Sequence, residues 1–118
     1  MKTVEYQNIK FYIGNNAIEN WKLFDDTKII NPDYFWFHLN SFPSPYVIMY
    51  ASMKELKAAF NSLEINQILI FASNLCKNNS KYKNFSNLKI IYTTLQKLSK
   101  SDTVGEVIIK GRKNIITL

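Results

Sequence analysis

The sequence has little of the chemistry from which most catalytic and metal sites are built. One histidine and one cysteine among 118 residues exclude an internal disulfide and a zinc site of the usual Cys and His spacing. Three glycines form no glycine-rich phosphate loop and no dinucleotide fingerprint. Acidic residues are sparse and, apart from Asp25-Asp26, isolated, so no general acid–base pair stands out. We therefore expect a binding protein without metal or cofactor, not an enzyme.

Long apolar segments are also absent. No run reaches the roughly 18 apolar residues of a membrane helix, and the first ten residues lack the apolar run of a signal peptide. We expect a soluble, cytoplasmic protein with no membrane contact. The length of 118 residues predicts one domain, residues 1–118, with a single core.

Negative charge is scarce in the C-terminal third. Residues 1–76 carry six Lys/Arg and seven Asp/Glu, whereas residues 77–118 carry nine and two. This segment supplies the whole net charge of +6, which favours a polyanionic partner such as nucleic acid. A composition rich in Lys, Asn and Ile is an alternative source of the charge, but it does not explain the missing acids.

The chain is organised around two aromatic runs, Tyr34–Leu39 and Tyr46–Ala51, that flank a turn containing Pro43 and Pro45. Short apolar runs bounded by Pro, Asn and Ser predict neighbouring strands inside a sheet, with the prolines in the connection. The first run holds the only histidine, His38. We expect it to be structural rather than catalytic.

Three capping signals predict helix starts. Asn16, Ser52 and Asn61 are each followed three residues later by Glu, as in a capping box. The first helix is expected to be short, with Ile18, Trp21 and Leu23 pointing inward, and a loop is expected at residues 25–33. The second should end near residue 60 and the third near residue 78. The third has the clearest apolar stripe, namely Ile65, Ile68, Leu69, Ala72, Leu75 and Cys76.

The remaining segments predict strands and turns. Residues 3–6 and 10–13 predict an N-terminal hairpin, residues 77–83 a basic loop, and residues 88–92 a buried strand. Residues 93–101 predict a turn or short helix, which if helical would place Lys97 and Lys100 on one face. Residues 104–109 and 115–118 predict a hairpin that turns at Gly111. The fold class is α+β, a mainly antiparallel or mixed sheet with two or three helices packed on it.

The candidate nucleic-acid contacts lie in this basic third. They are Lys77, Lys81, Tyr82, Lys83, Lys97, Lys100, Lys110, Arg112 and Lys113. We expect the cations to converge on one surface and to bind phosphates in a salt-sensitive way. Two interpretations of Tyr82 stay open: it stacks on an exposed base, or it lies on its own scaffold.

Several ordered blocks resemble the NFACT-R family. They cover residues 12–23, 32–38, 43–47, 72–80 and 91–107, and contain the motif residues Gly14, Asn15, Asn20, Trp36, His38, Ser44, Asn79, Ser80 and Gly105. The resemblance implies an RNA-binding module with a role in translation or ribosome-associated quality control. It also implies transfer or ribosomal RNA, and the ribosome, as partners. The sequence has no room for the further domains of large family members, so we expect a stand-alone member.

The chain departs from the family pattern at three positions. Tyr34 stands where the family usually has an acid, Tyr46 where it has a histidine, and Ser99 where it has the first of two lysines. Contacts that depend on those family residues are lost here. Two alternatives to RNA binding remain open: a protein-interaction adaptor and a DNA-binding module of the same fold.

Overall fold

A six-stranded sheet forms the middle layer of the computed structural model, which describes residues 1–118. Its strands follow the order β1-β2-β4-β3-β5-β8, and every neighbouring pair is antiparallel. They comprise β1 (Lys2–Tyr6), β2 (Ile9–Ile13), β3 (Phe35–Leu39), β4 (Val47–Met49), β5 (Lys89–Thr94) and β8 (Asn114–Thr117). The α+β prediction is confirmed.

Two predicted strand pairs form as expected. Strands β1 and β2 make the N-terminal hairpin, and Gln7 and Asn8 at its turn have φ of 55° and 63°, as a tight two-residue turn requires. Strands β3 and β4 pair with Phe37 opposite Val47. Pro43 and Pro45 lie in the connection between them.

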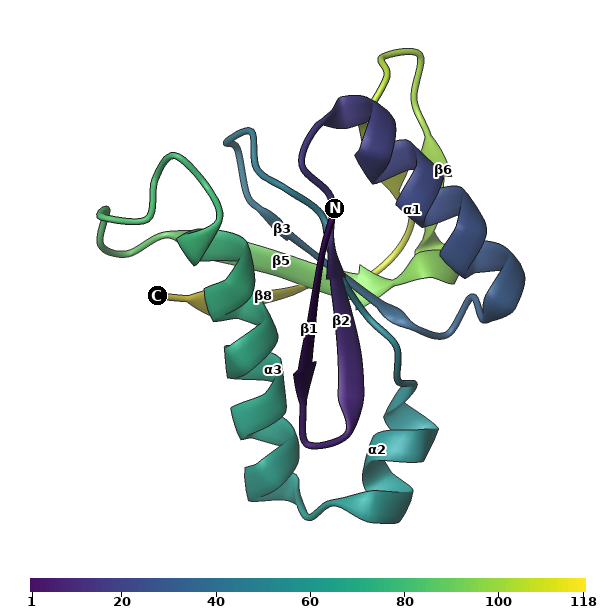
Figure 1. Cartoon of the computed structure of the whole chain (residues 1–118), viewed down its shortest axis with the longest axis vertical. Coiled ribbons are helices and arrows are strands. Elements are labelled where there is room, and N and C mark those ends of the chain that lie inside the picture. The colour runs from purple at the N-terminus through teal and green to yellow at the C-terminus, as the bar shows by residue number, and fades with distance from the viewer.

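Helices α2 (Met53–Ala59) and α3 (Ser62–Asn78) cover one face of the sheet (Figure 1). Both begin with the predicted capping boxes, Ser52 with Glu55 and Asn61 with Glu64. Their apolar side chains pack on Phe11, Phe35, Phe37, Leu39 and Met49. Cys76 is fully buried in this core, and burial raises the pKa of its thiol to about 12.

The other face carries α1 (Ala17–Ile30) and a small sheet of β6 (Leu98–Lys100) and β7 (Val107–Ile109) (Figure 1). A 3-10 turn, η1 (Leu95–Lys97), leads from β5 into β6. This layer has a separate core of buried side chains, which are Leu23, Phe24, Trp36, Tyr46, Ile48, Ile91, Leu95 and Leu98. Residues of β3 therefore alternate between two cores, which explains its nearly continuous apolar sequence.

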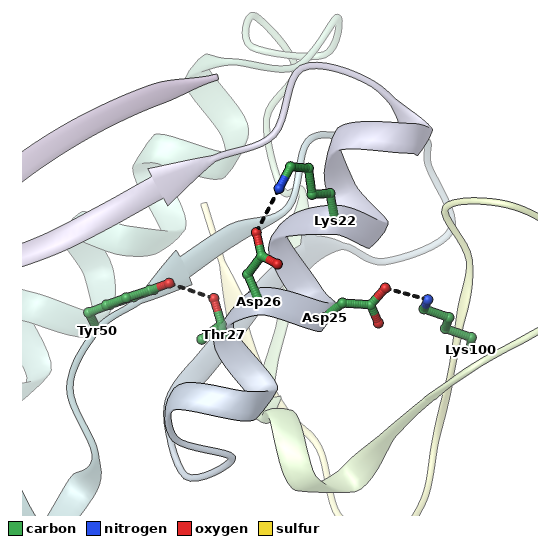
Figure 2. Close-up of polar contacts among 6 residues, drawn as sticks. All are labelled: Lys22, Asp25, Asp26, Thr27, Tyr50 and Lys100. Atoms are coloured by element: carbon green, nitrogen blue, oxygen red, sulfur yellow. Dashed lines mark hydrogen bonds and ion pairs between the residues drawn. The ribbon is translucent and has the colours of Figure 1, made fainter.

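The loop predicted for residues 25–33 is wrong, because α1 continues to Ile30. Ile18, expected to point inward, is 75% exposed, whereas Asn20 and Thr27 are buried. The Thr27 hydroxyl shares a 2.8 Å hydrogen bond with the Tyr50 hydroxyl, as Figure 2 shows. Since polar groups occupy the buried side, the helix lacks the apolar stripe that identifies most surface helices.

The predicted hairpin around Gly111 is also wrong. Strand β7 pairs with β6, and β8 crosses to the edge of the main sheet beside β5. Residues 110–113 form the exposed connection between the two sheets. Lys97 ends the 3-10 turn and Lys100 lies in β6, so the two do not share a helix face. None of the helices combines the length and apolarity needed to cross a membrane.

Candidate nucleic-acid interface

An open groove of about 750 Å³ lies on the side of the sheet that carries α1. Four segments surround it: the N-terminus of α1, the β3–β4 loop, the loop after α3, and the turn between β6 and β7. These segments reach the same end of the molecule, at the top of Figure 1. The residues inside the groove include Trp36 and His38 from β3, Tyr46 just before β4, and Ile91 from β5.

Three aromatic rings pack together along the groove. The Trp36 and His38 rings stack with centroids 5.4 Å apart, and the Tyr46 ring meets each of them edge-on at 5.5 Å. Burial lowers the pKa of His38, so the imidazole is neutral at pH 7. The indole N–H of Trp36 is buried and has no hydrogen-bond partner in the fold. This wall therefore carries no net charge and one unpaired donor.

Tyr46 links the motif blocks to one another. Its backbone N–H donates to the Asn20 side chain at 3.1 Å, and its carbonyl accepts from the Gly14 N–H at 3.0 Å. Its hydroxyl donates to the Gly105 carbonyl. Residues from three parts of the chain are thus joined at one side chain and its backbone. Burial raises the pKa of the Tyr46 phenol, so it stays protonated and able to donate.

At the two motif glycines, Gly14 and Gly105, neighbouring atoms lie too close to leave room for a side chain. A Cβ on Gly14 would lie 2.1 Å from the Asn20 side-chain oxygen, the atom that holds the Tyr46 backbone. Gly105 has φ +89°, and a Cβ there would lie 2.6 Å from the Ala17 Cβ. Both positions exclude larger residues. Gly14 lets the end of β2 lie against Asn20, and Gly105 lets the β6–β7 turn lie against the start of α1.

Ser44, Asn79 and Ser80 shape the loops at the rim. The Ser44 hydroxyl accepts from the Leu39 N–H at 3.0 Å. The Asn79 amide donates to the Leu75 carbonyl at 2.8 Å, at the end of α3. The Ser80 hydroxyl accepts from the Tyr82 N–H at 3.1 Å. These polar residues stabilise irregular backbone locally.

Every motif residue except Gly14 lines the groove. The eight that line it are Asn15, Asn20, Trp36, His38, Ser44, Asn79, Ser80 and Gly105. They come from segments up to 90 residues apart in the sequence, and only folding brings them together.

An aromatic edge, formed by Phe42, Tyr82 and Phe85, lies at the rim of the groove, which Phe42 and Tyr82 line. The Tyr82 ring centroid is 4.6 Å from that of Phe42 and 5.4 Å from that of Phe85. Phe42 and Phe85 are 39% and 54% exposed, whereas Tyr82 is half-buried and packs on the core under α3. Tyr82 therefore lies on its scaffold and also lines the groove.

Sequence reasoning missed Phe42 and Phe85. A signal was present, because each is a large apolar residue in a loop made mostly of Ser, Pro, Asn and Lys. A large apolar side chain in such a loop either anchors the loop or stays available to a partner. These two do both, since they contact Tyr82 and remain partly exposed.

The predicted cations form two groups rather than one surface. The groove lysines, Lys77, Lys81 and Lys83, lie at the end of α3 and in the loop that leads to β5; Lys81 lines the groove. The distal cations, which are Lys97, Lys110, Arg112 and Lys113, gather where β5 ends.

Backbone pairing defines this second group. The Lys110 N–H donates to the Lys97 carbonyl at 2.7 Å, and Tyr92, near the end of β5, pairs with Asn114. A strand of six residues, such as β5, spans roughly 20 Å, so the two groups lie toward opposite ends of β5, with Ile109, the neighbour of Lys110, at the edge of the groove.

Lys100 differs from the other predicted contacts because it is engaged within the fold. Its ammonium pairs with the Asp25 carboxylate (Figure 2) and lies 4.9 Å from the centre of the Trp21 ring. The groove lysines and the distal cations have no carboxylate partner, since the three ion pairs of the fold involve Met1, Lys22 and Lys100. Lys100 therefore attaches the small sheet to α1.

Acidic groups are few around the groove. Glu106 lines it, and its backbone carbonyl accepts from the Trp21 indole at 3.1 Å. The Glu19 carboxylate accepts from the Asn15 N–H at 3.0 Å, and that hydrogen bond lowers the pKa of Glu19. No three His, Cys, Asp or Glu side chains come together in the arrangement of a metal site.

Comparison with known protein families gives a match. The family described as the NFACT protein RNA binding domain matches residues 2–116. The chain belongs to the NFACT-R family. The resemblance of the sequence blocks is thereby confirmed over nearly the whole chain, and the groove is the place where the NFACT-R motif residues meet.

A solved structure shares the NFACT-R fold of this chain. It is the C-terminal part of the fibronectin/fibrinogen-binding protein from Streptococcus suis, with a TM-score of 0.78 and 18% sequence identity. The match covers 98% of this chain and 44% of that one, so this chain spans less than half of its length. At this identity the likeness shows the fold alone. A search of curated proteins finds no match.

The departures from the NFACT-R pattern fall in different places. Tyr46 is part of the groove, whereas Tyr34 packs against Tyr50 with ring centroids 5.0 Å apart, beyond the other end of β3. Ser99 lies in β6. Of the three, only Tyr46 lines the groove, where its hydroxyl donates to the Gly105 carbonyl in the β6–β7 turn.

Proposed function

We propose that this NFACT-R domain is a non-catalytic module that binds RNA across the mouth of the groove. The groove lysines contact the phosphates of the strand, and Tyr82 forms part of the groove wall next to Lys81. One observation carries the proposal: Lys81 and Tyr82 line the same groove as eight of the nine motif residues. The distal cations lie at the far end of β5 and serve at most to attract RNA over longer distances.

The proposal predicts how strongly the affinity for RNA depends on salt concentration. Each phosphate contact to single-stranded nucleic acid contributes about −0.7 to the slope of log affinity against log salt. Three groove lysines, none paired with a carboxylate, then give a slope of about −2. Affinity for RNA should fall roughly 20-fold between 50 and 200 mM salt.

We further propose that the RNA is transfer or ribosomal RNA and that the domain acts in translation or ribosome-associated quality control in the cytoplasm. Its support is the family resemblance. Sequencing the RNA that co-purifies with the protein from its native cell tests this step. Enrichment of transfer or ribosomal fragments is expected, and enrichment of messenger RNA alone would contradict it.

A pair of charge-reversal variants tests the location of the site. The first carries Lys77→Glu, Lys81→Glu and Lys83→Glu; the matched control carries Lys97→Glu, Lys110→Glu and Lys113→Glu. Both change the net charge by the same amount, and all six side chains lack an ion-pair partner. Anisotropy titrations with a labelled single-stranded RNA should show loss of binding in the first variant and a loss of less than about tenfold in the control.

The opposite order of effects would place the site at the distal cations. Equal losses would leave only a general electrostatic attraction. A DNA strand of the same sequence belongs in the same titration, because the charge of the groove lysines does not distinguish the two polymers. Equal affinity for both would widen the function to nucleic acid in general.

A further inference from the structure

We propose that the groove takes up one unpaired base of the bound RNA, which stacks on Phe42. This inference rests on the proposed function and extends it from backbone contact to base contact. The predicted lysines alone would require no cavity, because phosphates can be bound on an open surface.

The size of the groove is the first argument. Its volume of about 750 Å³ falls within the range of about 300–1,000 Å³ that is typical of small-ligand pockets. A nucleotide belongs to this size class. A base in a duplex is stacked and paired, so it cannot enter a concave site unless it leaves the helix. The groove therefore selects an unpaired nucleotide.

The lining of the groove suits a neutral aromatic ligand. Phe42 lines it and is 39% exposed, and the half-buried Tyr82 supports its ring at 4.6 Å. A ring that is held from one side and open on the other provides a stacking surface. Deeper in the groove the Trp36–His38–Tyr46 cluster offers rings rather than ionised groups.

Hydrogen-bonding groups without partners are also present. Trp36 is 2% exposed, and its indole N–H is unpaired. The side chains of Asn15 and Ser41 line the groove, and neither makes a hydrogen bond within the protein. An amide, which can both donate and accept, and a hydroxyl in the same groove match the mixed edge of a nucleobase. Lys81 on the rim would hold the adjoining phosphate.

A strand that keeps its phosphates but lacks its bases separates this inference from the proposed function. We would titrate the protein with a single-stranded RNA and with an abasic ribose-phosphate strand of equal length. Stacking on an aromatic side chain strengthens binding by roughly 5- to 150-fold per base, so wild type should prefer the base-bearing strand by about that factor. Phe42→Leu keeps the apolar volume but removes the ring, and should lose most of this preference while binding the abasic strand as wild type does.

Two controls complete the experiment. Ile29→Ala, at an 86% exposed position near the end of α1, should keep the full preference. A 2-aminopurine base in the strand should lose fluorescence on binding to wild type, which tests stacking without any variant. Equal binding of both strands by wild type, or unchanged 2-aminopurine fluorescence at saturation, would refute the base site and leave RNA binding intact. Binding of neither strand would refute both proposals.

Discussion

Replacing Gly14 by alanine should break the contact that joins the first motif block to the groove. The new Cβ would lie 2.1 Å from the Asn20 side-chain oxygen, far inside van der Waals contact, so the Asn20 amide must move. That oxygen accepts the Tyr46 N–H at 3.1 Å, in a buried hydrogen bond. Gly14 does not have a positive φ, so the cost arises from this displacement and not from backbone strain.

The expected loss of stability follows from the Tyr46 N–H, which is left buried without an acceptor. A buried N–H without an acceptor costs about 1–3 kcal/mol, so we expect Gly14→Ala to reduce the free energy of unfolding by about 2 kcal/mol. With a urea m-value of about 2 kcal/mol per M, the urea midpoint should fall by about 1 M. In an Asn20→Ala background the clashing oxygen is absent, and Gly14→Ala should then cost less than about 0.5 kcal/mol.

Urea unfolding of wild type, both single variants and the double variant gives the interaction energy directly. A coupling of more than about 1 kcal/mol is expected between the two positions. Additive effects, or a Gly14→Ala variant as stable as wild type, would refute the claim that Gly14 makes room for the Asn20–Tyr46 hydrogen bond.

Three further predictions concern other groups. Lys100→Ala should lower the free energy of unfolding by less than about 1 kcal/mol, because its pair with Asp25 is partly exposed. The same variant should keep its RNA affinity within about twofold of wild type, and a large loss of affinity would place Lys100 in the site. Burial lowers the pKa of His38 below its unfolded value, so the stability it confers is complete above about pH 6.5 and declines as pH falls through that value. Urea denaturation at pH 7.5 and 5.5 should show a larger decrease in the free energy of unfolding for wild type than for His38→Gln. Equal decreases would contradict this. Cys76 is buried with a pKa raised to about 12, so iodoacetamide at pH 8 should label it only after unfolding; rapid labelling of the native protein would show that α3 opens.

Local signals predicted most of the framework. The caps at Ser52 and Asn61 marked the starts of α2 and α3, and the apolar stripe of α3 gave its buried side. The turn at Gln7-Asn8 and the two aromatic runs gave the first hairpin and the central strands. In each case the residues that determine the element lie within a few positions of one another.

The errors have a common physical origin in long-range contacts. Helix α1 continues through residues that looked like a loop, because buried Asn20 and Thr27 are satisfied by Tyr46 and Tyr50. Strand β8 pairs with β5 rather than with its neighbour β7. Nothing near Gly111 distinguishes a tight hairpin from a crossing between sheets.

The candidate site was only partly predictable for the same reason. Charge counts pointed to Lys81, and the motif residues included eight of the 23 residues that line the groove. Neither could show that the distal cations lie toward the other end of β5. The aromatic edge depends on the contact between Phe42 and Tyr82, which lie 40 positions apart in the sequence.

Photo-crosslinking tests the location of the RNA most directly. A single-stranded RNA containing 4-thiouridine would be bound to the wild-type protein and irradiated, and the crosslinked peptides would be identified by mass spectrometry. If RNA lies across the groove, crosslinks should fall on the peptides that contain Phe42 and Tyr82. Crosslinks confined to residues 97–113 would contradict the account and move the interface to the far end of β5.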